Sequence, residues 1–213
     1  MSLRANVLMS EASQRLATLW AAIPSMSKKC LVFIGIVFTA IAVISRLTPH
    51  PWNFTPMGAL FIFSGFILPR RYLALPLLAQ LATDLVIGTY DWRIMASVYG
   101  CYLAVAFTAY ALKRRYSFFT ILITSLAGSL AFFFITNAAV WLWSGMYQTD
   151  FSGLASSYLA GIPFFRNSLS GDLFYSAVFF GLYEVALWFA PHPRPDLCSR
   201  RGMEICSSLT EES

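Results

Sequence analysis

Charged side chains are scarce in this chain of 213 residues. Asp, Glu, Lys and Arg make up 12% of it, whereas a typical soluble domain carries about 25%. Hydrophobic residues make up 58% of the chain and run in long uncharged stretches. The composition therefore predicts an integral membrane protein, with room for several spans and for no extramembrane domain.

The sequence also lacks the motifs of common catalytic and metal sites. Two histidines and four scattered cysteines form no metal-type spacing, and no GxSxG, HExxH or P-loop is present. An aspartyl pair made of Asp84 and Asp91 would need an aqueous site within the membrane. We therefore expect no enzyme, no metal and no cofactor.

The net charge of +5 comes from short basic clusters at the ends of the apolar runs. This placement is typical of topology determinants, not of a surface that binds nucleic acid. The clusters that would share the cytoplasmic side are Lys28/Lys29, Arg70/Arg71, Lys113–Arg115 and Arg194/Arg199/Arg200. With six spans, this asymmetry places both termini in the cytoplasm and predicts a multi-pass protein of the bacterial cytoplasmic (inner) membrane.

The predicted fold is an all-α integral membrane protein of six transmembrane helices, N-in/C-in, with a short interfacial helix between spans five and six. The spans are predicted at residues 30–45, 55–68, 72–88, 94–112, 118–143 and 169–189. The interfacial helix is expected within 144–167, ending near Pro163. The expected regions are a cytoplasmic N-terminal segment (1–27), a six-helix membrane domain (28–190) and a cytoplasmic polar tail (191–213).

The stretch 46–60, RLTPHPWNFTPMGAL, separates the first two predicted spans. Pro49, Pro51 and Pro56 exclude a continuous helix through it, and Thr55 is expected to cap a helix that starts at Pro56. The second span covers only about 21 Å, against about 30 Å for a bilayer core. Because irregular backbone at membrane depth must be covered by protein or line a water-filled cavity, the sequence predicts a cavity beside this turn.

In this topology, unusual polar and aromatic residues gather in the outer half of the membrane. Ionisable groups at that depth usually face a cavity or a partner, and aromatic walls with a few polar groups are typical of ligand pockets. The expected substrate-binding residues are Trp52, Asn53, Asp84, Asn137, Trp141, Tyr147, Arg166 and Asn167. The turn 46–56 and the connection 144–167 are expected to form a lid over the solute.

The charged members of this set each have a second interpretation. Asp84 either contacts a ligand or gate, or forms an ion pair with Arg93 at the interface. Arg166 either recognises a carboxylate or phosphate, or pairs with Asp172.

The uncharged members also leave two roles open. Asn137 either contacts the ligand or bridges helices through hydrogen bonds. Trp52 and Trp141 either line the pocket or belong to an interfacial aromatic belt.

The first span carries small residues at helical spacing, namely Gly35, Thr39 and Ala42. A face of this kind lets another helix approach closely. It packs either against the rest of the chain or against a partner protein, and the sequence leaves both open.

Four pieces of the chain resemble an uncharacterised bacterial membrane family of proposed transport proteins. They are RLTPHPWNFTPMGAL, LLAQLATDLVIG, FFFITNAAVWLW with the following YQTDFSGL, and YLAGIPFFRNSLSGDLFYS. The resemblance covers about residues 46–183. That family is in turn similar to the substrate-capture (S) components of energy-coupling-factor transporters.

The resemblance implies a six-helix fold that binds a vitamin-like solute from outside. It also implies docking on a membrane coupling subunit driven by two cytoplasmic ATPases. In S components, small residues of the first span face the coupling subunit. Gly35, Thr39 and Ala42 would fit that place, without forming a clear alanine motif.

The leading interpretation is a substrate-binding membrane subunit of a small-solute (vitamin-like) uptake system, which binds from the outer face without chemistry. Its expected partners are a small-molecule substrate, the lipid bilayer and a coupling subunit with ATPases, and not nucleic acid. The alternative is a structural or assembly scaffold of the membrane with no ligand, whose outer polar groups only hold its helices together.

Overall fold

The computed structural model describes residues 26–49, 51 and 53–189 of the chain. Ser27–Glu184 forms one compact unit, and Val185–Phe189 belongs to a second unit that is otherwise almost entirely outside the described residues. The polar tail 191–213 and nearly all of the N-terminal segment 1–27 also lie outside them, as do His50 and Trp52 of the turn.

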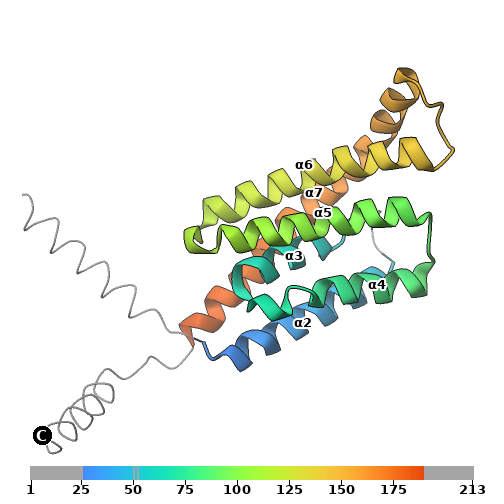
Figure 1. Ribbon diagram of the computed structural model, residues 1–213. Coiled ribbons are helices and arrows are strands. Elements are labelled where there is room, and N and C mark those ends of the chain that lie inside the picture. The colour runs from blue at the N-terminus through green and yellow to red at the C-terminus, as the bar shows by residue number, and fades with distance from the viewer. Residues whose placement is uncertain (1–25, 50, 52, 190–213) are drawn as a thin grey trace, which may run out of the picture. The chain divides into compact units, whose positions relative to one another are not determined.

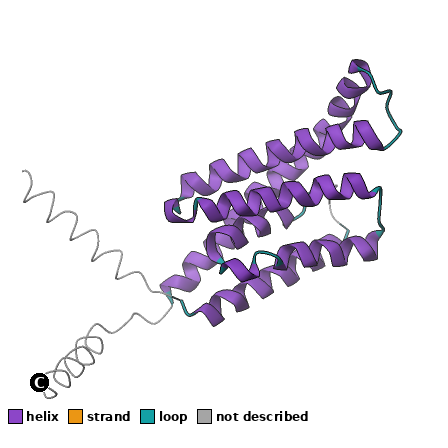
Figure 2. Ribbon diagram, viewed as in Figure 1, coloured by secondary structure: helices purple, strands orange, loops and turns teal. Residues whose placement is uncertain are grey.

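The described residues form α-helices joined by short connections, without any strand (Figure 2). The helices are α2 (Lys28–Leu47), α3 (Met57–Ile67), α4 (Leu75–Ile87), α5 (Trp92–Ala111), α6 (Phe118–Trp143) and α7 (Phe151–Trp188), as Figure 1 shows. Short 3-10 helices, Arg70–Tyr72 and Lys113–Arg115, lie before α4 and after α5. The prediction of an all-helical protein is confirmed.

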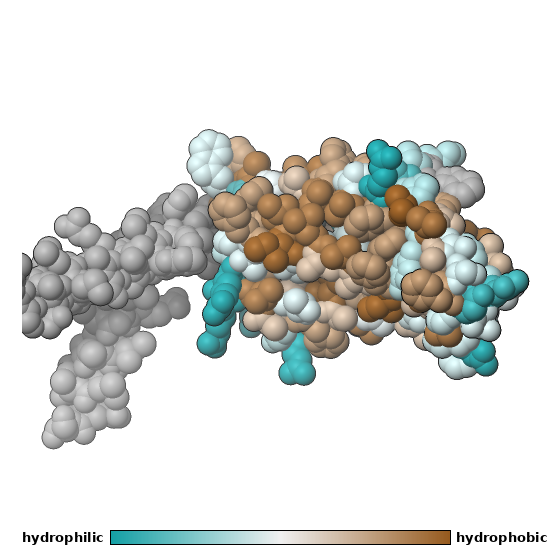
Figure 3. Space-filling view, turned by 90° about the horizontal axis from the view of Figure 1, so that it is seen from above, coloured by the Kyte–Doolittle hydropathy of each residue, from teal (hydrophilic) through white to brown (hydrophobic). Residues whose placement is uncertain are grey.

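Three of these helices, α2, α5 and α6, are long and apolar enough to cross a membrane. Fewer than a quarter of the residues in their most apolar stretches are buried inside the chain. Figure 3 shows a surface that is largely apolar, with hydrophilic side chains at its margins. A chain that exposes long apolar helices to its surroundings has the character of a membrane protein, as the composition predicts.

The core of the compact unit is α3, whose eleven residues are all buried. A helix that is apolar all round has no face suited to water and is stable only when surrounded. Its Phe63 lies 5.0 Å from the ring of Phe38 on α2 and 5.4 Å from that of Phe180 on α7. With eleven residues α3 is only about 17 Å long, so the second predicted helix is short, as expected; that it spans a membrane stays a prediction.

The N-terminus of α3 is capped from a distant part of the chain. Thr55 was expected to cap it, but this expectation is wrong: the helix begins at Met57 and no side chain of its own segment caps it. Instead, the Asp172 carboxylate of α7 lies against Gly58 and accepts a hydrogen bond from the N–H of Ala59. A carboxylate at this end is favourable, because it satisfies a free N–H and faces the positive end of the helix dipole.

The C-terminus of α3 receives a positive charge. The Nζ atom of Lys113 donates hydrogen bonds to the carbonyl oxygens of Ile67 and Leu68, at 3.1 and 3.2 Å. Helix carbonyls at a buried C-terminus have no intrahelical partner, and a cation there complements the negative end of the dipole. A carboxyl group from α7 and the Lys113 ammonium from the α5–α6 connection therefore contact the central helix at its two ends.

The prediction of a separate interfacial helix before span six is wrong. One helix, α7, runs from Phe151 to Trp188 and includes Pro163. A proline removes one N–H from the ladder, but neighbouring helices can hold the rest of a membrane helix together, so the helix need not end there. In Figure 1 the first part of α7, in gold, runs in a different direction from the remainder.

Candidate functional site

A cavity of about 1110 Å³ lies between the C-terminal ends of α2, α4 and α6 and the N-terminal half of α5. The turn after α2 contributes Asn53 and Thr55 to its lining, and the segment after α6 contributes Ser144 and Met146. Met146 is 75% exposed, so the lining reaches the surface at this end. Its volume is slightly above the usual range of about 300–1,000 Å³ for small-molecule sites.

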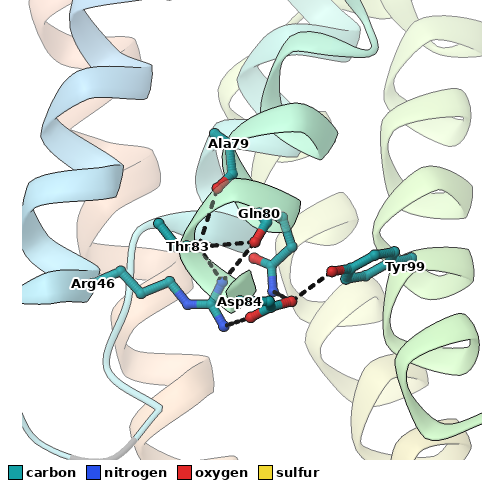
Figure 4. A network of polar contacts seen from close by, with 6 residues as sticks. All are labelled: Arg46, Ala79, Gln80, Thr83, Asp84 and Tyr99. Carbon is teal, nitrogen blue, oxygen red and sulfur yellow. Dashed lines mark hydrogen bonds and ion pairs between the residues drawn. The ribbon is translucent and has the colours of Figure 1, made fainter. Parts of the chain in front are cut away.

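A polar network joins three helices beside this cavity (Figure 4). Arg46 donates through Nη2 to Asp84 Oδ1 at 2.5 Å and through Nη1 to Thr83 Oγ1 at 2.6 Å. The other carboxylate oxygen of Asp84 accepts from Tyr99 OH at 2.7 Å and from Gln80 Nε2 at 3.2 Å. The network thus connects the end of α2 to α4 and α5.

This network satisfies a carboxylate that would otherwise be costly at membrane depth. Asp84 is 2% exposed, and it has an ion pair and two further hydrogen bonds. Its partner is Arg46 and not Arg93, which is exposed and lies over the Trp92 ring at 5.5 Å. Asp91 has a separate role, because it caps α5 by accepting a hydrogen bond from the Arg93 N–H at 2.9 Å.

Gln80 lines the cavity with a side chain that is almost fully buried. Its Nε2 group donates to Asp84, whereas its Oε1 has no hydrogen-bond partner among the described residues. The carboxylate of Asp84 only accepts, which fixes the amide with its NH₂ toward Asp84 and its oxygen on the other side. A buried carbonyl oxygen without a donor is unusual in a folded protein and calls for an explanation.

Aromatic side chains form much of the remaining lining. Tyr102 lines the cavity between Phe61, on which it stacks at 4.8 Å, and Phe132, at 5.1 Å. Trp143 and Tyr90 also line the cavity and are partly exposed. Burial, followed by the nearby Asp84 carboxylate, raises the pKa of Tyr90 to about 12, so its hydroxyl stays protonated at neutral pH and can donate.

The described end of the turn between α2 and α3, from Asn53 to Thr55, lies at the cavity. Asn53 has a φ of 60°, in the left-handed region that asparagine tolerates better than most residues. The Phe54 N–H donates to the Pro51 carbonyl at 2.9 Å, and the Phe54 ring packs 5.6 Å from that of Tyr175 on α7. The irregular backbone predicted for this stretch therefore borders a cavity and is anchored on a helix.

The predicted site residues Asn53, Asp84 and Asn137 differ in how they relate to the cavity. Asn53 lines it, and Asp84 lies behind Arg46 and Gln80. Asn137 lines a smaller void of about 30 Å³, which it shares with Asn53.

The Asn137 side chain contacts its own helix, α6, and the neighbouring helix α7. Its amide donates to the Phe133 carbonyl at 2.8 Å and lies against Gly161 of α7, where a Cβ atom would overlap it. The Ser157 hydroxyl of α7 donates to the backbone carbonyl of Asn137 at 2.9 Å. The sequence left two roles open for Asn137, and these contacts match the one in which it bridges helices.

The predicted site residues Trp141, Tyr147, Arg166 and Asn167 are not among the residues that line the cavity. Trp141 donates from Nε1 to the Gln148 carbonyl at 2.8 Å. Trp143, two positions later, lines the cavity instead. Tyr147 is half-buried in the connection between α6 and α7.

Arg166 and Asn167 lie within α7, where Arg166 is exposed and Asn167 is half-buried. Asp172, the alternative partner of Arg166, accepts a hydrogen bond from Ser129 at 2.6 Å and lies at the start of α3. Trp52 is outside the described residues. Whether Trp52, Trp141, Tyr147, Arg166 or Asn167 touches a solute stays a prediction.

The small-residue face of α2 lies against the chain itself. Gly35 and Ala42 are buried, and a Cβ on Gly35 would press on the Leu68 side chain. Thr39 is half-buried, and its hydroxyl donates to the Gly35 carbonyl at 2.7 Å. The structure therefore has the intramolecular packing that was one of the two expected uses of this face.

Sequence reasoning missed Gln80 and Tyr102 as candidate site residues. Gln80 stands four positions before Asp84, the spacing at which two side chains meet on one helix face. An amide one turn from a carboxylate in an apolar helix was the available signal. Tyr102 carried no such signal, because its place in the lining depends on how α5 packs against α3 and α6.

Comparison with known proteins identifies a family without assigning an activity. Residues 25–193 match the family described as "Family of unknown function (DUF6580)". Because the match covers most of the chain, the protein belongs to this family. No curated protein and no solved structure matches the chain.

Proposed function

We propose that this protein is a substrate-binding membrane subunit of an uptake system for a small, vitamin-like solute. The observation that carries the proposal is the cavity of about 1110 Å³, whose lining combines aromatic and aliphatic side chains with a few polar ones. Such a combination is the usual make-up of a small-molecule site. Binding would occur without chemistry, since the Arg46 and Asp84 side chains beside the cavity are paired with each other.

The proposed topology has six membrane segments, both termini in the cytoplasm and the cavity open to the outside of the bacterial inner membrane. Support comes from the ends of the helices. Lys28, Arg70–Tyr72 and Lys113–Arg115 lie at the ends remote from the cavity, where α2 starts and α3 and α5 finish. This clustering of cations is typical of cytoplasmic loops.

Energy for uptake would come from a partner. The chain has no P-loop or other nucleotide-binding motif. A membrane coupling subunit with cytoplasmic ATPases, as the resemblance to S components implies, would supply it. Because Gly35 packs against Leu68 of the same chain, such docking would use other surfaces or would follow a rearrangement of α2.

A protection experiment tests the cavity and its orientation together. In a background with the four native cysteines replaced by alanine, Thr136→Cys places a thiol in the cavity, and Gln148→Cys places one in the exposed connection after α6. Both are expected to react with a membrane-impermeant maleimide added to intact cells. A bacterial small-molecule extract should slow the reaction at position 136 only.

Two results would contradict the proposal. One is labelling of Thr136→Cys only after the cells are permeabilised, which would place the cavity on the other side. The other is labelling at position 136 that the extract leaves unchanged, which would favour a scaffold without a ligand.

A further inference from the structure

A groove of about 440 Å³ lies between the start of α6 and the last part of α7. One face of α6, over residues 118–125, and one face of α7, over residues 173–184, form its walls, and Tyr116 joins them in the lining. The groove shares no lining residue with the large cavity. It is therefore a separate feature, which the proposed binding of a solute does not use.

The groove is mostly apolar and reaches the surface of the chain. Ser125 and Ser176, both buried, share a hydrogen bond of 3.2 Å that joins the two helices. The exposed link is made by the Tyr116 hydroxyl, which donates to Glu184 Oε1 at 2.6 Å. Apart from these four residues, every residue of the lining is apolar or a glycine, and Phe118 is 74% exposed. At membrane depth, such an open apolar groove suits a hydrocarbon chain.

Two arginines without a partner stand next to the exposed link. Arg114 and Arg115 directly precede Tyr116 in the short helix Lys113–Arg115. Both are exposed, and neither forms an ion pair or a side-chain hydrogen bond in the described part of the chain. Lys113 differs, because its ammonium is bound to the carbonyl oxygens of α3. The two arginines outnumber the single acidic residue of the lining, Glu184, so this end of the groove is positive.

From the apolar groove and the free cations beside it we infer that this site binds an anionic phospholipid of the surrounding bilayer. One acyl chain lies between α6 and α7, and Arg114 and Arg115 bind the phosphate. Basic pockets between membrane helices on the cytoplasmic side suit such headgroups, and a guanidinium presents paired N–H donors to phosphate oxygens.

A membrane helix of another protein would also fill an apolar groove, but it would leave the two arginines without an anion. The inference goes beyond the proposed function. It uses only the proposed topology, which places this end of the groove in the cytoplasmic leaflet.

Lipid titrations of the purified full chain in mild detergent, followed by native mass spectrometry, test the inference. The two probes are palmitoyl-oleoyl phosphatidylglycerol and palmitoyl-oleoyl phosphatidylethanolamine, which have the same acyl chains. Only the first has a net negative charge. We expect the first molecule of phosphatidylglycerol to bind at least about fivefold more tightly than the first molecule of phosphatidylethanolamine.

A pair of double variants assigns this preference to the two arginines. Arg114→Gln with Arg115→Gln should remove it. Arg70→Gln with Arg71→Gln changes the net charge by the same amount at another exposed pair, and should leave the preference intact.

Gly181→Leu tests the groove itself. A Cβ at this lining position meets nothing within 4 Å, so a side chain can be added there without a clash at Cβ. It should lower the affinity for phosphatidylglycerol at least about fivefold, because it occupies the place of the acyl chain. Gly100→Leu on α5, where a Cβ also meets nothing within 4 Å, should not change that affinity. Should Gly181→Leu fail to fold, the arginine variants still decide the question.

Several results would overturn the inference. One is equal binding of the two lipids to the wild type, and another is a preference that survives without Arg114 and Arg115 or falls equally without Arg70 and Arg71. Unchanged phosphatidylglycerol binding in Gly181→Leu would place the lipid elsewhere. A dimer of the chain that phosphatidylglycerol leaves intact and Gly181→Leu abolishes would assign the groove to a second copy. None of these results bears on the large cavity, which the labelling at position 136 tests separately.

Discussion

The Arg46 guanidinium at the end of α2 lies 2.5 Å from the Asp84 carboxylate of α4, thirty-eight positions later in the chain. This ion pair lies beside the cavity, which Arg46 lines, and joins α2 to α4. Removing one partner of a buried ion pair costs about 3–5 kcal/mol. Because Arg46 is 18% exposed, we expect a smaller loss from Arg46→Gln or Asp84→Asn.

The pairing itself is measured by a double-mutant cycle. Thermal unfolding in mild detergent should show that Arg46→Gln with Asp84→Asn destabilises less than the two single changes added together. Arg93→Gln, at the exposed arginine that the sequence offered as the alternative partner, should change little. Additive effects at positions 46 and 84 would show that the pair contributes nothing.

Gly58 makes the approach of Asp172 to the start of α3 possible. A Cβ at this position would overlap the carboxylate, so Gly58→Ala should displace the cap and destabilise the protein by about 1–3 kcal/mol, as overpacking does. Gly100→Ala on α5 is the control, since a Cβ there meets nothing within 4 Å. It should be neutral or stabilising, by up to about 1 kcal/mol.

The comparison of these two alanine variants is read from their unfolding temperatures. Equal effects at positions 58 and 100 would contradict the close contact between Asp172 and the first turn of α3.

Lys113 is expected to stabilise the other end of α3. Lys113→Met keeps the apolar stem but removes the ammonium that binds the Ile67 and Leu68 carbonyls. The expected loss is about 1 kcal/mol, the size of a cation at a helix C-terminus. Arg114→Met changes an exposed neighbour of the same charge, and a loss as large there would show that net charge, and not the cap, is responsible.

Asp150 caps the start of α7 in a pH-dependent way. The hydrogen bond from the Gly153 N–H, followed by that from the Ser152 hydroxyl, holds the pKa of Asp150 below its ordinary value of 3.8. A carboxylate with a lowered folded-state pKa contributes stability above the ordinary pKa and loses it as the pH falls through the folded value.

The difference in unfolding temperature between the wild type and Asp150→Ala should therefore be constant above about pH 5 and shrink at lower pH. Asp150→Asn, whose amide oxygen also caps helices, should show no such dependence in this range. A difference that persists or grows in strong acid would contradict the assignment of the cap to the ionised carboxylate.

The fold followed from the sequence where the determinants are local. The apolar run 118–143 predicted the bounds of α6, and the prolines at 49, 51 and 56 predicted the break between α2 and α3. Helix length likewise predicted a short second helix, but its burial on all sides was not predicted. The prediction that a helix ends near Pro163 was wrong. A proline removes only one backbone N–H, and this loss does not end a helix that is held by neighbouring helices.

The sequence predicted the position of the cavity but not the contacts around it. The cavity lies beside the turn where the sequence placed it, and Asn53 and the Asp84 network belong to it. The pairing of Arg46 with Asp84 depends on how α2 packs against α4, which periodicity along one helix cannot predict. The same holds for Asp172, which caps a helix more than a hundred positions earlier.

Native mass spectrometry of the purified chain in mild detergent tests solute binding most directly. The wild type, incubated with a bacterial small-molecule extract, is predicted to carry a non-lipid adduct of constant mass. Val98→Trp, which fills the cavity from α5, should lose this adduct, and Phe107→Trp, on the exposed face of the same helix, should keep it. A wild type that carries only lipid, or an adduct that survives in Val98→Trp, would contradict the claim that this cavity binds a small solute.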